Sequence, residues 1–359
     1  MPVNVVRAGL TLVLAFAAAS LFAWLHSPIP WMLGPLLVVS LASILGAPTR
    51  SWPPLRNSAQ CVIGTALGLY FTPQVMGLMA SLWWAIAIAI VWALALGWAF
   101  GAWLYRANAR LLKGEESTQR ATTFFAASIG GASEMTLLAE REGAQTDLVA
   151  ASHSLRIVIV MLTVPFGVTA LGMQGIDPTL PGARVVHWDG LLLLGAASAA
   201  GAWLMNKTGR ANPWFLGALL VAMGLTLAGV QLSAMPQLLS NAAQMVIGVS
   251  LGVRFQRQFL HAAPRWLLTV GLGTVGMIVA CVAFAALLAW ATGLHPATLV
   301  LGTSPGGIAE MAITAKVLQL GVPVVTTFQV CRLVAVLILG EPLFRWTERR
   351  RSAARSEGA

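Results

Sequence analysis

The sequence predicts an all-α polytopic membrane protein made of two inverted repeats of about five crossing helices, each with a broken or re-entrant Gly-Gly element. The 359-residue chain is 58% hydrophobic and only 9% charged, whereas soluble domains carry roughly 25% charged residues. The segment Ser-x-Gly-Gly-x-x-Glu-Met occurs twice, at 128–135 and 304–311, an offset of 176 residues. In each copy a lone arginine, Arg156 or Arg332, follows the glutamate by 22 residues inside an apolar run.

The first apolar run, at 8–25, resembles a signal peptide in its basic start and small residues. We expect it to be retained, because 17–24 has an internal counterpart at 196–203. The second span, at 31–46, opens with Trp-Met-Leu-Gly, and its counterpart opens with Trp-Phe-Leu-Gly at 214–217. The halves therefore share their element order from the first helix onward.

The third element of each half carries amides that are costly in lipid unless they meet partners. We expect these side chains to face protein or a polar cavity. They are Asn57 and Gln60 in the first half and Asn241 and Gln244 in the second.

The remaining elements of the first half are one long span, a basic loop, the Gly-Gly element and the arginine span, expected at 75–104, 106–120, 121–139 and 148–166. The second half repeats this order. We therefore divide the chain into a first membrane repeat (1–173), a Pro- and Gly-rich linker (174–189), a second membrane repeat (190–346) and a basic tail (347–359) that we expect to be disordered.

The net charge of +10 comes mostly from Lys and Arg at the ends of apolar segments, where the positive-inside rule places them. If every element crossed the membrane, Lys207 and Arg254 would lie outside. If each Gly-Gly element enters and leaves on one side, both return inside with the termini. We therefore expect ten crossing helices and two re-entrant elements, while a continuous but broken helix at the Gly-Gly position stays an alternative.

Two adjacent glycines interrupt a helix, and the freed backbone groups must be buried or line a wet cavity. Each glutamate follows in the first turn of the next helix, whose positive end favours a carboxylate or an anionic ligand. Broken helices of inverted repeats form the sites of secondary transporters. The candidate substrate-binding residues are Ser128, Gly130, Gly131, Glu134 and Arg156 in the first copy and Ser304, Gly306, Gly307, Glu310 and Arg332 in the second.

A structural interpretation competes with this one, in which Glu134–Arg156 and Glu310–Arg332 are neutralising ion pairs that hold the broken helices. No Cys/His cluster occurs, so we expect no metal and no cofactor. We expect no enzyme activity, because no nucleophile–base constellation is present. We expect no direct nucleic-acid binding, because the cytoplasmic loops are too short for a recognisable reader.

Through both Gly-Gly/Glu-Met segments and both Trp-x-x-Gly openings, the chain resembles the AbrB-type duplicated bacterial membrane proteins, often labelled ammonia monooxygenases or AbrB family regulators. The resemblance covers nearly the whole chain and implies a multi-pass protein of the bacterial inner membrane. One family member is linked genetically to the expression of another gene. The sequence shows no metal-ligand cluster that an oxygenase would need. At the level of architecture alone, the repeats are also similar to secondary citrate and glutamate carriers.

We therefore expect a secondary transporter that moves a small anionic metabolite across the lipid bilayer. Arg156 and Arg332 would bind the anion or position the glutamates, and Glu134 or Glu310 would carry a coupling proton. The alternative is a membrane-bound, indirect regulator of gene expression. Association into homo-oligomers stays open.

Overall fold

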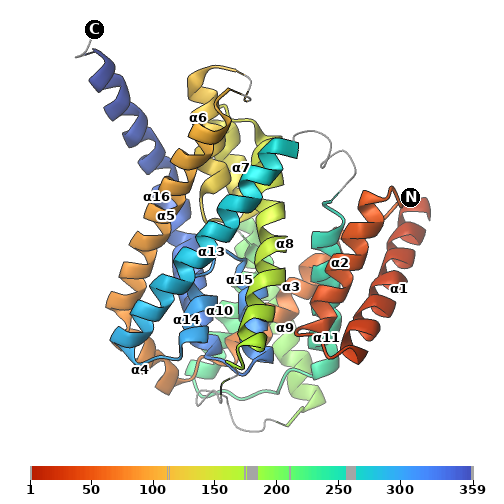
Figure 1. Ribbon diagram of the computed structural model, residues 1–359. Coiled ribbons are helices and arrows are strands. Elements are labelled where there is room, and N and C mark those ends of the chain that lie inside the picture. Colours follow the sequence, from red (N-terminus) through yellow and green to blue (C-terminus); the bar gives the residue numbers. More distant parts are fainter. Residues whose placement is uncertain are drawn as a thin grey trace.

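The structure is a computed structural model that describes residues 2–110, 112, 114–173, 175, 185–209, 212–255 and 264–356 (Figure 1). The described residues form fifteen α-helices. They are α1 (Pro2–Trp24), α2 (Pro30–Ile44), α3 (Pro53–Gly68), α4 (Pro73–Ser81), α5 (Trp83–Asn108), α6 (Glu116–Ala127), α7 (Ala132–Arg141), α8 (Thr146–Ala170), α9 (Trp188–Lys207), α10 (Pro213–Leu227), α11 (Gln237–Gly252), α13 (Pro264–Thr292), α14 (Pro296–Thr303), α15 (Ile308–Val317) and α16 (Val322–Ser356).

Six of the described helices are long and apolar enough to cross a membrane, namely α1, α5, α8, α9, α13 and α16. The chain is therefore a multi-pass membrane protein. Four other helices at expected crossing positions are shorter, with 15 residues in α2 and α10 and 16 in α3 and α11. At a rise of about 1.5 Å per residue they span roughly 24 Å, less than the roughly 30 Å hydrocarbon layer.

Proline sets the start of many helices, because its fixed φ suits the first helical position and its missing N–H is not needed there. Seven of the described helices begin at a proline, namely Pro2, Pro30, Pro53, Pro73, Pro213, Pro264 and Pro296. Their start positions follow from the local sequence.

The prediction of one continuous span at 75–104 is wrong, because the structure divides this segment into α4 and α5 at Leu82. Leu82 has φ −95° and ψ 9°, outside the helical range. It is neither glycine nor proline, so the local sequence does not mark the break. The preceding pair, α3 and α4, is bent by 84°.

The helices pack as two bundles that each draw on both halves of the sequence. The outer bundle contains α1, α2, α3, α9, α10 and α11, of which Figure 1 shows α1, α2 and α11 on the right. The hairpin bundle contains α5 to α8 and α13 to α16, on the left. Helices from the two halves are thus interleaved in space.

Within the outer bundle, α3 packs on α10 and α11 packs on α2. Glycine makes both contacts close, as small residues do between membrane helices. A Cβ atom on Gly64 would overlap the carbonyl oxygen of Phe215, and one on Gly248 would lie 2.5 Å from the carbonyl oxygen of Met32. The same backbone contact is therefore made twice, at matching positions of the two halves.

The basic tail predicted at 347–359 is not disordered over most of its length, because α16 continues to Ser356. One i, i+3 ion pair, between Arg351 Nη1 and Glu348 Oε1 at 3.0 Å, supports this end of the helix. Residues 357–359 lie outside the described residues.

The predicted linker at 174–189 lies largely outside the described residues, of which it includes only 175 and 185–189. It connects α8 to α9.

Candidate functional site

Both Gly-Gly elements fold back on themselves as hairpins. The backbone N–H of Gln145, just before α8, donates to Thr122 Oγ1 in α6 at 2.9 Å. The backbone N–H of Gly321, just before α16, donates to Thr298 Oγ1 in α14 at 3.2 Å. After α7 the chain has thus returned to the level of α6, and after α15 it has returned to the level of α14. Neither Gly-Gly element is therefore one continuous broken helix.

The two hairpins occupy opposite halves of the molecule. Figure 1 shows α6 and α7 in the upper half of the view and α14 and α15 in the lower half. Both ends of the chain lie in the upper half as well. The turns of the two hairpins therefore point toward the middle of the protein.

The repeated motif has a packing explanation. A Cβ atom on Gly130 would lie 2.7 Å from Met135 Cε, and one on Gly131 would overlap the carboxylate of Glu134. The first glycine thus makes room for the methionine and the second for the folded-back glutamate. The second copy makes the same contacts, with Gly306 against Met311 and Gly307 against Glu310.

Arg156 closes the C-terminal end of α6. Its Nη1 donates to the carbonyl of Ala127 at 3.1 Å and its Nη2 to the carbonyl of Ser128 at 2.8 Å. These carbonyls belong to the helix end, where intrahelical donors run out and a positive charge is favourable. Nη2 also lies 2.7 Å from His153 Nδ1, and the side chain is only 2% exposed.

Arg332 does the same for α14. It donates to the carbonyl of Ser304 at 2.6 Å and to that of Gly306 at 2.9 Å. It also donates to Gln329 Oε1 at 2.6 Å, and Gln329 Nε2 donates to the carbonyl of Leu301 at 2.7 Å. Gln329 occupies the position of His153 in the second copy.

The ion-pair interpretation of the glutamates and arginines is wrong. All four side chains are described, and neither Glu134 with Arg156 nor Glu310 with Arg332 is among the ion pairs that the described residues form. The spacing of 22 residues brings each arginine to the end of the helix before the Gly-Gly turn. Each glutamate lies beyond that turn, at the start of the next helix.

A cavity of about 110 Å³ lies between the two bundles, and we call it the interbundle cavity. Both Gly-Gly turns and both glutamates reach it from the hairpin bundle, while α3, α10 and α11 border it from the outer bundle. Since liquid water occupies about 30 Å³ per molecule, the space matches about three or four waters or one small polar group. Its polar side chains are Arg56, Gln60, Glu134, Asn212, Ser250, Arg254 and Glu310.

The charges that line this cavity balance formally, with two arginines and two glutamates. Arg254, just beyond α11, interacts electrostatically with both Glu134 and Glu310. Glu310 is only 8% exposed, whereas Glu134 is half-buried. Arg254 is therefore attracted by both repeated carboxylates and repelled by Arg56, and it forms no ion pair among those that join described residues.

Amides complete the wall. Gln60 Nε2 donates to Asn212 Oδ1 at 3.3 Å. Asn212 precedes α10 with φ 48°, in the left-handed region that asparagine tolerates better than most residues. Within the described ranges, no three His, Cys, Asp or Glu side chains gather in a way that could hold a metal ion.

Several predicted site residues lie elsewhere. The hydroxyl groups of Ser128 and Ser304 donate to carbonyls one turn earlier, at 2.9 Å and 2.5 Å, and neither residue lines the cavity. Gln244 is buried away from it, and Asn241 Oδ1 accepts from its neighbour Gln237 at 2.8 Å. Asn57 is half-buried, and it does not line the cavity either.

Arg56, Arg254 and Asn212 line the cavity although they were not among the candidate site residues predicted from the sequence. Arg56 lies one helical turn before Gln60, and that spacing places both on one face of α3. This spacing is a sequence signal for Arg56 as a site residue, because the polar side chain of Gln60 lies on the same face. Arg254 and Asn212 reach the cavity only through the packing of α10 and α11 against the other helices.

The chain is similar to known proteins over most of its length. A family model described as "Transition state regulatory protein AbrB" matches residues 31–348. A Bacillus subtilis (strain 168) protein named "Uncharacterized protein YhjN" is 27% identical over 346 residues, which cover 88% of this chain and 87% of that protein. An Escherichia coli (strain K12) protein named "Putative regulator AbrB" is 25% identical over 349 residues, covering 95% of this chain and 97% of that protein.

Proposed function

The chain belongs to the AbrB family, and we propose that it is a secondary transporter that moves a small anionic metabolite through the interbundle cavity. The observation that carries this proposal is the meeting of both Gly-Gly turns with two arginines in one cavity between two bundles. Secondary transporters bind their solutes where broken helices of two repeats meet. We also place the protein in the bacterial inner membrane.

The attraction for an anion comes from the hairpins and from the outer bundle together. The N-terminal ends of α7 and α15 border the cavity at Gly131 and Gly307, and helix N-termini favour negative charge. Arg56 and Arg254 add full positive charges. A carboxylate-sized group fits the volume of about 110 Å³.

The two glutamates supply a means of coupling. In the solute-free state they balance the arginines, so an anionic solute competes with the Glu134 and Glu310 carboxylates for Arg254. Protonation of a glutamate removes one competitor and releases the arginine for the solute. One proton would thus accompany the anion, and movement of one bundle against the other would expose the cavity to the two sides in turn.

The test is uptake into proteoliposomes of a panel of labelled carboxylates (acetate, succinate, glutamate and citrate), with and without a pH gradient. We expect at least one to accumulate when the outside is acidic. Arg254→Gln and Glu310→Gln should abolish that uptake, whereas Arg349→Gln, at an exposed position of α16 away from the cavity, should not. Uptake that survives Arg254→Gln would place the route elsewhere.

A second candidate is a membrane-bound, indirect regulator of gene expression. Two names favour it, because the family description contains the word "regulatory" and the name of the E. coli relative contains the word "regulator". A deletion strain separates the two functions. If a transport-inactive Arg254→Gln protein restores the normal transcript profile as fully as the unchanged protein, regulation does not depend on solute movement.

A further inference from the structure

A second cavity, of about 250 Å³, lies where α5, α6 and α16 meet. We call it the α5–α16 cavity. Three arginines line it, Arg106 from α5, Arg120 from α6 and Arg351 from α16, against a single acid, Glu348. It is far from neutral, unlike the interbundle cavity, and the transport proposal does not use it.

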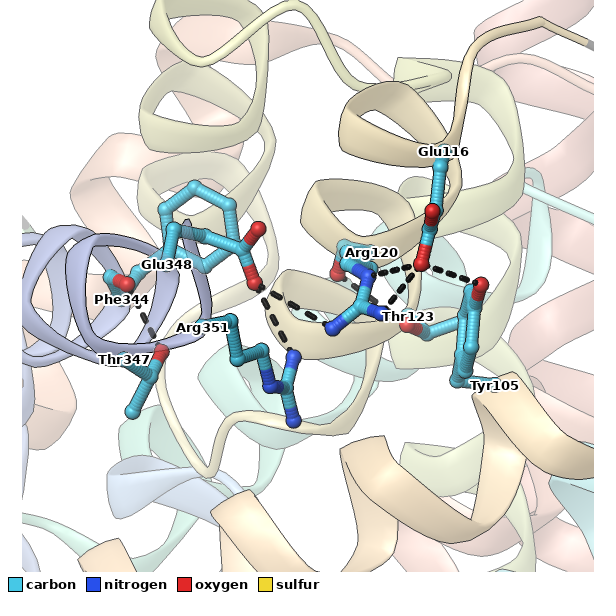
Figure 2. A network of polar contacts seen from close by, with 8 residues as sticks. All are labelled: Tyr105, Glu116, Arg120, Thr123, Phe344, Thr347, Glu348 and Arg351. Atoms are coloured by element: carbon cyan, nitrogen blue, oxygen red, sulfur yellow. Dashed lines mark hydrogen bonds and ion pairs between the residues drawn. The ribbon is translucent and has the colours of Figure 1, made fainter. Parts of the chain in front are cut away.

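Figure 2 shows the polar network along this cavity. Arg120 Nε donates to Glu116 at 2.9 Å, and its guanidinium carbon lies 4.9 Å from the centre of the Tyr105 ring. Glu348 lies between two arginines, 3.8 Å from Arg120 Nη1 and 3.0 Å from Arg351 Nη1. The network holds the end of α16 against the start of the first hairpin.

The arginines that line the cavity outnumber the carboxylates that line it. Arg106 takes part in no ion pair that joins described residues. Arg351 is exposed and shares Glu348 with Arg120. An anion that enters the cavity therefore meets two exposed arginines, of which Arg106 has no carboxylate partner among the ion pairs of the described residues.

The other wall of the cavity is apolar and reaches the lipid-facing surface. Trp98 lines it and is 45% exposed, on the side of α5, which is long and apolar enough to cross a membrane. Arg106 follows eight residues later, in the last turn of that helix, or about 12 Å further along the axis. A tryptophan inside the span and arginines at its end are typical of the level where lipid headgroups begin.

We propose that the α5–α16 cavity binds the phosphate of an anionic phospholipid, with Arg106 and Arg351 as its ligands and an acyl chain against Trp98. Basic pockets between membrane helices accept acidic headgroups, and the planar guanidinium fork matches phosphate oxygens. The exposed apolar wall favours a lipid over a soluble phosphate compound, which has no chain to place there. Glu348 competes with the phosphate for Arg351.

The experiment measures lipid binding to the full-length protein in detergent by native mass spectrometry. The two probes are phosphatidylglycerol and phosphatidylcholine with identical acyl chains. We expect phosphatidylglycerol to bind at least about fivefold more tightly, since each surface arginine contributes roughly a factor of five to acidic-lipid binding. Arg106→Gln and Arg351→Gln should each weaken that binding roughly fivefold.

Arg349→Gln is the matched control, because it removes the same charge from an exposed position of the same helix outside the cavity. It should change the affinity less than about twofold, far below the effect of a headgroup ligand. Glu348→Gln should strengthen binding, which keeps the proposal testable if an arginine variant fails to fold. Melting temperatures of all variants establish which are folded.

Three results would overturn the proposal. Equal affinity for the two lipids would remove the role of the headgroup charge. If Arg349→Gln weakened phosphatidylglycerol binding as much as Arg106→Gln, the lipid would be attracted to basic residues in general rather than to this cavity. Displacement of phosphatidylglycerol by millimolar glycerol 3-phosphate would assign the cavity to a soluble phosphate compound.

Discussion

The two Gly-Gly hairpins share their backbone contacts and differ at the side chains around them. In both, an arginine holds the end of the first helix and a threonine holds the returning chain. The partner of the arginine differs, His153 in one and Gln329 in the other. The glutamates differ too, because Glu310 is buried and Glu134 is half-buried.

This difference distinguishes the contacts that stabilise both hairpins from the side chains that line the interbundle cavity. The contacts that occur twice satisfy backbone groups of each hairpin, so we expect either hairpin to lose stability without them. The exposure of the glutamates depends on what each hairpin packs against, so the two carboxylates that line the interbundle cavity are not equivalent. Substitutions at paired positions can test this separation.

Replacing the capping arginines should have the largest effect. Arg156→Ala and Arg332→Ala each remove hydrogen bonds to buried carbonyls, at roughly 1–3 kcal/mol per unsatisfied group. We expect about 3 kcal/mol or more of destabilisation in either copy, measured as a fall in melting temperature by tryptophan fluorescence in detergent.

Arginine-to-lysine variants provide the control for charge. A lysine keeps the charge but lacks the planar fork that reaches several acceptors at once, so Arg332→Lys should fall between Arg332→Ala and the unchanged protein. If Arg156→Ala kept the melting temperature of the unchanged protein while Arg332→Ala lowered it strongly, the two hairpins would not be equivalent.

Alanine at the two glycines of one turn should separate folding from binding. Gly130→Ala forces a Cβ against the fully buried Met135, and overpacking costs typically 1–3 kcal/mol. Gly131→Ala meets only the movable carboxylate of Glu134. It should keep the melting temperature but weaken solute uptake about tenfold, the effect of roughly 1.4 kcal/mol. Normal uptake by Gly131→Ala would argue that the folded-back carboxylate has no role in the site.

Removing the threonine hydroxyls should have a smaller effect. Thr122→Val and Thr298→Val remove the hydroxyl groups that accept from the backbone N–H groups of Gln145 and Gly321. We expect a loss of about 1–2 kcal/mol in each variant, together with faster hydrogen exchange at 145 and 321. Unchanged exchange at both positions would show that water or a neighbouring carbonyl replaces the hydroxyl.

Exchanging the arginine partners should have the smallest effect. His153 presents Nδ1 to Arg156 and Nε2 to the carbonyl of Phe125 at 2.9 Å, so the neutral ring accepts from one and donates to the other. Gln329 does both with its amide. His153→Gln should therefore change stability by less than about 1 kcal/mol, one net hydrogen bond. A larger loss in thermal melts would mean that the imidazole has a role that the amide lacks.

The sequence by itself determined where the two Gly-Gly hairpins turn and which class of protein this is. Glycine pairs and prolines act on the residues beside them, so the turns at 130–131 and 306–307 and the seven helix starts at proline could be predicted locally. Composition alone indicated a membrane protein, and the first-turn position of Glu134 and Glu310 pointed to the residues that meet at the cavity.

The tertiary structure decided which groups meet. Arg156 and Arg332 bind carbonyls more than 20 residues away rather than the glutamates, because side-chain partners depend on how helices are placed, which equal spacing does not encode. Arg254 reaches the interbundle cavity, where both glutamates lie, only after α11 packs against α2 and α3 in the outer bundle. The break at Leu82 has no glycine or proline to announce it, so it too arises from packing rather than from local backbone preference.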